Sequence, residues 1–184
     1  PTGEPWIAGS TGVLRFDPAA GRFRRVVAMG EERVHALAFD AHGGAWLQRL
    51  SGLAHYRRAA GGWALLERVD ARHGMPALAA AGLAVDARQR VWIATSRGLY
   101  RWDPGRRRVH RIGIRDGGGE EILDRAALLR PDGVLMAATA DGSVLLVDTA
   151  APDPPPLVPA LRIAPLAVRR DGAWRALADG RGPG

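Results

Sequence analysis

Residues 91–104 read VWIATSRGLYRWDP, and shorter forms of this phrase return along the chain. One copy surrounds Trp6 (PWIAG) and another surrounds Trp46 (AWLQ), while weaker copies surround Leu135 and Trp174. Aligned on these anchors, the unit recurs every 39 to 46 residues. A unit of this length is typical of one four-stranded propeller blade and is too long for a leucine-rich or ankyrin repeat.

The local pattern decides between strands and the paired helices of an armadillo-type array, which the repeat length alone also permits. A short apolar run precedes the anchors, as in residues 37–40, 83–86 and 166–169, and each run ends near a glycine or a charged turn. Short apolar runs between turns indicate β-strands and leave no room for a helix of about ten residues or more.

The unit around Trp92 predicts an antiparallel meander. Its expected strands are an inner strand at 83–86, a second at 91–95, a third at 99–102 and an outer strand at 108–112. Gly98 suits a hairpin position with positive φ, and Pro104 suits a type I or II turn. We therefore expect an all-β fold, a β-propeller segment of about four antiparallel four-stranded blades, over residues 1–150.

The anchors also predict how the blades pack. A twisted sheet in a propeller buries both faces against its neighbours, so a broad side chain at a fixed place in the second strand fills the wedge between blades. We assign this inter-blade role to Trp6, Trp46, Trp92 and Trp174, with Leu135 as the anchor of the fourth blade. The first copy begins at its second strand, so we expect the segment to belong to a larger propeller.

The phrase at 91–104 resembles the two-component regulator propeller repeat, whose blades have the form D-x-x-G-x-(V/L)-W-(I/V)-(G/A)-T-x-x-G-L-x-(R/x)-(Y/F)-D-P. This copy departs from the pattern at Arg90, where glycine is usual. Residues 12–18 keep the second half of the pattern, the copy at Trp46 lacks the Asp-Pro ending, and residues 145–148 keep a variant ending. The resemblance covers roughly residues 1–150.

The resemblance implies a sensor. Such propellers are similar to the input regions of membrane-spanning histidine kinases, hybrid two-component systems and diguanylate cyclases. The chain is then expected to be periplasmic or extracytoplasmic, as part of an inner-membrane protein. It would recognise a small solute or glycan without catalysis and relay it to neighbouring domains and a downstream output. A homodimer formed through the full-length protein is left open.

Residues 151–184 allow two interpretations. A Pro-rich connection at 153–156 marks a boundary, after which an apolar run begins at Leu161. In the resembled family such a segment leads into an immunoglobulin-like domain. The run at 166–174 also matches the inner half of a blade. We expect either a partial fifth blade, which is slightly favoured, or the start of an immunoglobulin-like domain.

Composition argues against several functions. The net charge is +7, but all 26 basic residues are arginine, they are scattered, and no nucleic-acid motif accompanies them. The absence of cysteine removes disulfides and thiolate metal sites. The five histidines, at 35, 42, 55, 73 and 110, show no paired metal spacing. We expect no metal, no cofactor, no nucleic-acid partner and no membrane span in this segment.

Ligand recognition is expected on one rim of the channel. The connections that enter each inner strand, at 30–35, 73–80 and 117–125, open on the same rim, where propellers usually bind ligands. The predicted ligand-binding residues are Arg33, His35, Arg72, His73, Glu121, Asp124 and Arg125.

Two other functions stay open. A periplasmic propeller enzyme that acts on polysaccharide would need an acid and a base that converge on the rim. A protein-interaction scaffold would bind partners without any small ligand.

Overall fold

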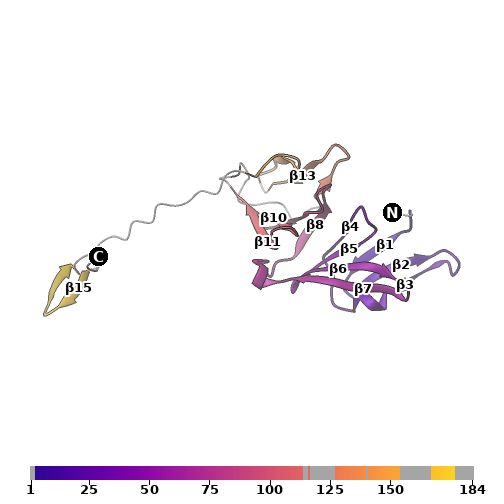
Figure 1. Cartoon of the computed structure of the whole chain (residues 1–184), viewed down its shortest axis with the longest axis horizontal. Helices are drawn as coiled ribbons and strands as arrows, with labels where there is room; N and C mark the ends of the chain where they lie inside the picture. The colour runs from indigo at the N-terminus through magenta and orange to yellow at the C-terminus, as the bar shows by residue number, and fades with distance from the viewer. Residues whose placement is uncertain (1–2, 114–115, 117–126, 140, 154–166, 177–184) are drawn as a thin grey trace. The chain divides into compact units, whose positions relative to one another are not determined.

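The computed structural model of the chain describes residues 3–113, 116, 127–139, 141–153 and 167–176 (Figure 1). The chain divides into two compact units, Pro1–Pro152 and Asp153–Gly184. The predicted ligand-binding residues Glu121, Asp124 and Arg125 lie outside the described residues, as does the apolar run that begins at Leu161.

The described part of the first unit forms four antiparallel sheets, here called blades 1 to 4 (Figure 1). Blade 1 contains β1 (Trp6–Gly9), β2 (Gly12–Asp17) and β3 (Arg22–Arg25). Blade 2 contains β4 (Ala36–Phe39), β5 (Ala45–Arg49), β6 (Gly52–Ala59) and β7 (Gly62–Val69). Blade 3 contains β8 (Ala80–Val85), β9 (Val91–Thr95), β10 (Gly98–Asp103) and β11 (Arg108–Ile112). Blade 4 contains β12 (Leu128–Leu129), β13 (Val134–Ala138) and β14 (Val144–Asp148).

Each blade is a meander in which consecutive strands pair, so the predicted all-β propeller segment is confirmed. In blade 3 the second and outer strands have the predicted bounds, and the inner strand begins earlier, at Ala80. Two short 3-10 helices, η1 (Val27–Met29) and η2 (Ala71–His73), lie in the connections that lead to blades 2 and 3.

Gly52 shows why glycine recurs after the second strand. It begins β6 with a φ of +129°, and a Cβ at this position would lie 2.1 Å from the carbonyl oxygen of Val69. Neither the backbone conformation nor the contact tolerates a side chain. The glycine therefore permits the third strand to run close against the end of the outer strand.

We expect Gly52→Ala to lower the free energy of unfolding by about 2 to 4 kcal/mol, because it adds backbone strain and overpacking at one position. Urea unfolding followed by circular dichroism measures this. Gly61→Ala is the matched control, since a Cβ there meets nothing within 4 Å. Equal effects of the two substitutions would contradict the structural reason given for Gly52.

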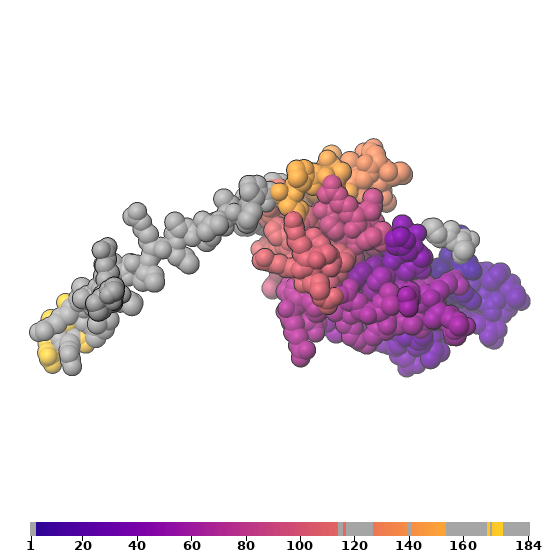
Figure 2. Space-filling model, viewed as in Figure 1, coloured from indigo at the N-terminus to yellow at the C-terminus, as the bar shows by residue number. Residues whose placement is uncertain are grey.

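Apolar clusters join neighbouring blades, and each second-strand Trp faces the blade that follows it. Trp46 and Leu53 of blade 2 pack with Val91 and Ile93 of blade 3. The remaining junctions repeat this arrangement: Trp6, Ala8 and Val13 lie with Ala45 and Leu47, while Trp92 and Ala94 lie with Leu135 and Ala137. In the space-filling view, the purple and magenta residues of blade 2 adjoin the pink residues of blade 3 (Figure 2).

The predicted anchor of blade 4 is wrong by one residue. The N–H of Asp86 donates to the carbonyl of Arg90 in blade 3, and the N–H of Arg130 donates in the same way to Val134 in blade 4. Counting from these turns, Met136 holds the position of the anchor Trp in blade 3. Leu135 is fully buried on the opposite face, where it packs with Trp92 and Ala94 of blade 3.

The Met136 face of blade 4 carries exposed apolar side chains. Leu128 and Leu146 both pair with Met136 and are 62 % and 59 % exposed, and Val144 is 57 % exposed. On blades 2 and 3 the corresponding face is covered by the following blade. This face is therefore the open end of the described stack.

The second unit is described only as a hairpin of β15 (Ala167–Arg170) and β16 (Ala173–Ala176). Trp174 on β16 is 71 % exposed. The inter-blade packing predicted for Trp174 is therefore not seen in its own unit, because a two-stranded hairpin offers no second sheet against which to bury the ring. The hairpin does not decide between a partial fifth blade and the start of an immunoglobulin-like domain.

Candidate functional site

The predicted ligand-binding residues lie on two separate connections of the first unit. Arg33 is exposed, and half-buried His35 donates its backbone N–H to the carbonyl of Gln48 at 2.8 Å. Arg72 and His73 belong to η2, before blade 3. Among the described residues, no hydrogen bond or ion pair joins Arg33 or His35 to Arg72 or His73, so the structure does not assemble these four side chains into one site.

Asp70 gives Arg72 and His73 a local structural role. Its Oδ1 accepts a hydrogen bond from the backbone N–H of Arg72 at 2.9 Å and lies 3.1 Å from Nδ1 of His73. The His73 ring also meets Trp102 edge-on, with centroids 5.4 Å apart. The hydrogen bond from the backbone N–H of Arg72 is the largest influence on the pKa of Asp70 and holds it below its usual value.

A more organised set of polar groups lies at the opposite end of the blades, where a turn joins the first two strands. In blade 2, Oδ1 of Asp40 accepts hydrogen bonds from the backbone N–H groups of His42 and Gly44, both at 2.8 Å. In blade 3, Oδ1 of Asp86 accepts in the same way from the N–H of Arg90 at 3.0 Å. Gly44 and Arg90 therefore hold equivalent positions.

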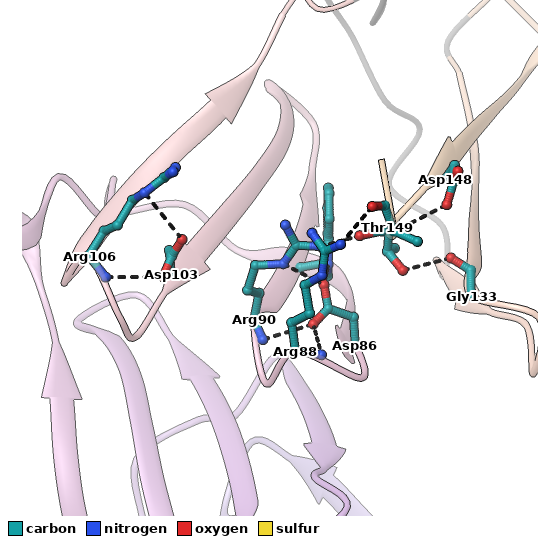
Figure 3. Close-up of polar contacts among 10 residues, drawn as sticks. Asp86, Arg88, Arg90, Asp103, Arg106, Gly133, Asp148 and Thr149 are labelled. Carbon is teal, nitrogen blue, oxygen red and sulfur yellow. Dashed lines mark hydrogen bonds and ion pairs between the residues drawn. The ribbon is translucent and has the colours of Figure 1, made fainter. Parts of the chain in front are cut away.

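Arg90 fills the junction between blades 3 and 4 (Figure 3). Its Nε donates to Oδ2 of Asp86 at 2.8 Å, and its Nη2 donates to the carbonyl of Thr149. Oδ2 of Asp86 also accepts from Nε1 of Trp92 at 2.8 Å, and the Arg90 guanidinium lies 5.5 Å from the centroid of that ring. Nearby, Nη2 of Arg88 donates to the carbonyl of Ala150 at 2.8 Å. The Arg90 side chain thus ties the two blades together.

The junction between blades 2 and 3 has a pocket instead. Gly44 has no side chain, and a Cβ there would lie 2.2 Å from Oδ2 of Asp40 and 2.5 Å from Nε2 of His55. The His55 ring stacks on Trp46, with centroids 4.1 Å apart, and its Nε2 lies 2.8 Å from Oδ2 of Asp40. The pocket has a volume of about 390 Å³ and is lined by Asp40, His42, Gly44, Trp46, His55, Arg57, Leu66, Glu67, Gln89 and Pro104.

The junction between blades 1 and 2 has a second pocket, of about 280 Å³. Trp6 meets Phe39 and Trp63 edge-on there, with centroids 5.2 and 5.6 Å apart. Glu4 holds the position of Gly44 and Arg90, two residues before the anchor Trp, and lies 3.6 Å from Arg58. The same sequence position therefore carries glutamate, glycine and arginine in the three successive junctions.

Asp40 is ionised at neutral pH. Burial, the largest single influence, raises the pKa of this carboxyl, but hydrogen bonds from the Gly44 N–H, from His55 and from the His42 N–H together outweigh it, so the pKa lies below its usual value. The carboxylate is held mainly by backbone donors and is 3 % exposed. It is a fixed negative charge in the wall of the pocket.

The lowered pKa predicts a pH-dependent contribution to stability. A carboxyl whose pKa is lower in the folded state stabilises the fold above its unfolded value, about 3.9, and loses that contribution as pH falls through the folded value. Wild type should therefore lose stability relative to Asp40→Asn as pH falls below about 4. Urea unfolding of both proteins between pH 6 and pH 3 measures the difference. A constant difference over this range would contradict the prediction.

The sequence contained part of the signal for these junctions. The glycine of the repeat pattern stands three residues before the Trp, at Gly43 in blade 2 and Gln89 in blade 3, where φ is +77° and +62°, so the departure assigned to Arg90 belongs to Gln89. Gly44 and Arg90 follow this position, and Asp40 and Asp86 lie four residues before them. Comparing equivalent residues between the repeat copies leads to the junctions between blades. The expected location of loops on one rim of the channel does not lead there.

Among the described residues, no group of three or more His, Asp or Glu side chains is placed to hold a metal ion. Within the same residues, no helix has the length and apolar character needed to cross a membrane.

No family model and no curated protein matches this sequence. Solved structures share its fold. The extracellular domain of BT4673 from B. thetaiotaomicron, described both as a one-component system and as a hybrid two-component system, superposes with a TM-score of 0.57 in each of its two structures. The identity is 17 % and 16 %, and the match covers 78 % of this chain and 20 % of that chain.

Two further structures are similar. YCF48 bound to D1 peptide has a TM-score of 0.51 at 12 % identity, over 80 % of this chain and 47 % of that chain. The computationally designed Ika4 protein has a TM-score of 0.54 at 18 % identity, over 80 % of this chain and 86 % of that chain. At these identities the similarities show the fold, a partial β-propeller. The chain spans about a fifth of the BT4673 domain.

Proposed function

We propose that this chain is part of the extracytoplasmic recognition region of a bacterial two-component signalling protein. In this role the propeller binds a solute or glycan and relays binding to an output domain of the same polypeptide. The propeller segment itself recognises and does not catalyse. The output, a histidine kinase or a diguanylate cyclase, belongs to other parts of the protein.

One observation carries the proposal. The phrase at 91–104, which resembles the two-component regulator propeller repeat, forms β9 and β10 of a regular blade. The same fold occurs in an extracellular domain described as part of a two-component system. The sequence phrase carries the proposal, and the shared fold supports it only loosely, because the same fold occurs in YCF48 and in the designed Ika4 protein.

The open face of blade 4 supports a larger propeller. Leu128, Val144 and Leu146 expose apolar side chains on the side through which blades 2 and 3 contact their successors. Burying such a face is favourable at roughly 25 cal/mol per Å² of apolar surface. We infer that a further blade of the same polypeptide covers it.

The polar chemistry of the junctions favours recognition over catalysis. Asp86 accepts hydrogen bonds on both carboxylate oxygens, and Asp40 is bonded by two backbone N–H groups and lies beside His55. A general acid needs a carboxyl whose pKa is raised toward neutrality, whereas the pKa of Asp40 is lowered. Polysaccharide turnover by the complete protein would favour the enzyme alternative.

The location can be tested with reporter fusions to the full-length gene. Alkaline phosphatase inserted after Pro152 should be active, because the enzyme matures only outside the cytoplasm, and β-galactosidase inserted at the same place should be inactive. The complete reading frame should also encode a membrane span followed by a kinase or cyclase. The reverse reporter pattern, or a frame without such an output, would contradict the proposed function.

A further inference from the structure

The third strands of blades 1, 3 and 4 end in the same kind of turn. Asp17, Asp103 and Asp148 close β2, β10 and β14, and Oδ1 of each accepts a hydrogen bond from a backbone N–H two or three residues later. In blades 1 and 3 an outer strand follows this turn, beginning at Arg22 and at Arg108. The turn therefore returns the chain to the edge of its own blade.

Blade 4 departs from this arrangement. After Asp148, the described residues of the first unit contain no outer strand, and the unit ends at Pro152. The sequence continues with prolines at 154–156, which have no backbone N–H to donate to an edge strand. Among the described residues, the exit segment, residues 149–152, is thus not held by an outer strand of its own blade.

Two arginines of blade 3, here called the arginine clamp, hold the exit segment instead (Figure 3). Nη2 of Arg88 donates to the carbonyl of Ala150 at 2.8 Å, and Nη2 of Arg90 donates to the carbonyl of Thr149. Thr149 is buried, and its hydroxyl donates to the carbonyl of Gly133 at 2.7 Å. Hydrogen bonds from a guanidinium are charge-assisted and stronger than those between neutral groups. The exit segment therefore depends on the neighbouring blade.

The clamp is also part of the junction between blades 3 and 4. The Arg90 side chain is fixed by Oδ2 of Asp86 and lies against Trp92, whose ring belongs to the cluster that joins the two blades. A shift of blade 4 against blade 3 would move the carbonyl of Thr149 relative to Arg90. Hydrogen bonds weaken steeply as their geometry departs from the preferred distance and angle. The packing of the junction therefore determines how firmly the clamp holds.

We propose that the arginine clamp is a conformational device that couples the packing of blades 3 and 4 to the connection between the two units. With the clamp closed, the exit segment is held on the propeller. When the junction loosens, both carbonyls are released and the connection begins at Asp148 instead of Pro152. This regulatory role rests on the proposed function, in which the propeller relays binding to an output domain, but the clamp can be measured without a ligand or an output.

Hydrogen exchange of the complete protein, followed by mass spectrometry, tests the clamp in peptides that cover residues 149–153. Arg88→Gln removes the donor to Ala150 and should speed exchange there by about threefold or more, because a bond that opposes local opening is lost. Arg97→Gln is the matched control. Arg97 is also an exposed arginine of blade 3, and its side chain has no hydrogen bond or ion pair among the described residues. Exchange in the control, and in β9 of both variants, should stay unchanged.

A second pair of variants tests the coupling to the junction. Leu135 and Leu47 are both fully buried, but Leu135 lies in the cluster between blades 3 and 4 and Leu47 in the cluster between blades 1 and 2. Leu135→Ala should speed exchange at residues 149–153 by about threefold or more relative to Leu47→Ala, since cavities act mainly on the groups that pack around them.

Three results would overturn the proposal. The first is equal exchange at residues 149–153 in Arg88→Gln and Arg97→Gln. The second is an equal rise in β9 of Arg88→Gln, which would mean that the whole unit is destabilised. The third is equal exchange at residues 149–153 in Leu135→Ala and Leu47→Ala. None of them changes the reporter-fusion test, so failure of the clamp and failure of the sensor role are distinguishable.

Discussion

Replacing Trp92 with alanine is expected to lower the free energy of unfolding by about 3 to 5 kcal/mol, the usual cost of deleting a buried Trp side chain. The ring is 2 % exposed and lies in the cluster that joins blades 3 and 4. The guanidinium carbons (Cζ) of Arg90 and Arg101 lie 5.5 and 5.4 Å from the centroid of the Trp92 ring. The substitution therefore removes apolar packing and two cation–π contacts together.

Urea unfolding followed by circular dichroism measures the effect of Trp92→Ala. Trp174→Ala is the matched control, because that side chain is 71 % exposed and its loss should change the free energy of unfolding by less than about 0.5 kcal/mol. A similar effect of the two substitutions would show that Trp92 is not buried between blades.

Replacing Asp86 with alanine is expected to cost about 3 to 5 kcal/mol, the range observed when one partner of a buried ion pair is removed. The side chains of Asp86 and Arg90 are 1 % and 7 % exposed. Figure 3 shows the two side chains paired with each other. The variant leaves the Arg90 guanidinium buried beside an apolar methyl group. It also removes the acceptor of Nε1 of Trp92 and of two backbone N–H groups in the turn.

Two comparisons check the reason for the Asp86 effect. Asp103→Ala removes a more exposed carboxylate that pairs with Arg106 in the same blade, and should cost about 1 kcal/mol or less (Figure 3). The double variant Asp86→Ala/Arg90→Met should be more stable than Asp86→Ala, because no uncompensated charge stays buried. A double variant less stable than Asp86→Ala would contradict the ion-pair explanation.

The repeat predicted the fold because each blade is a local meander. Strands β9 and β11 have the predicted bounds, since hairpin glycines and turn residues fix them within a few positions. The error at Leu135 arose where apolar residues occupy both faces of β13. There the sequence offers two adjacent candidates, and the equivalent turn hydrogen bonds at Asp86 and Arg130 decide between them.

The junction site was less accessible to sequence reasoning because its parts are distant along the chain. Arg90 donates to the carbonyl of Thr149, 59 residues later. The pocket at Gly44 likewise depends on Pro104, which belongs to the next blade. A missing side chain leaves no motif, so the pocket becomes visible only when the packing order of the blades is known.

That packing order is tested most directly by a double-mutant cycle between Trp92 and Leu135. The two side chains share the cluster between blades 3 and 4, whereas Leu47 belongs to the cluster between blades 1 and 2. Trp92→Ala and Leu135→Ala should show a coupling energy of about 0.5 to 3 kcal/mol, and Trp92→Ala and Leu47→Ala should be additive within about 0.5 kcal/mol. Additivity in both cycles, or coupling of Trp92 to Leu47 alone, would contradict the order in which each Trp faces the blade that follows it.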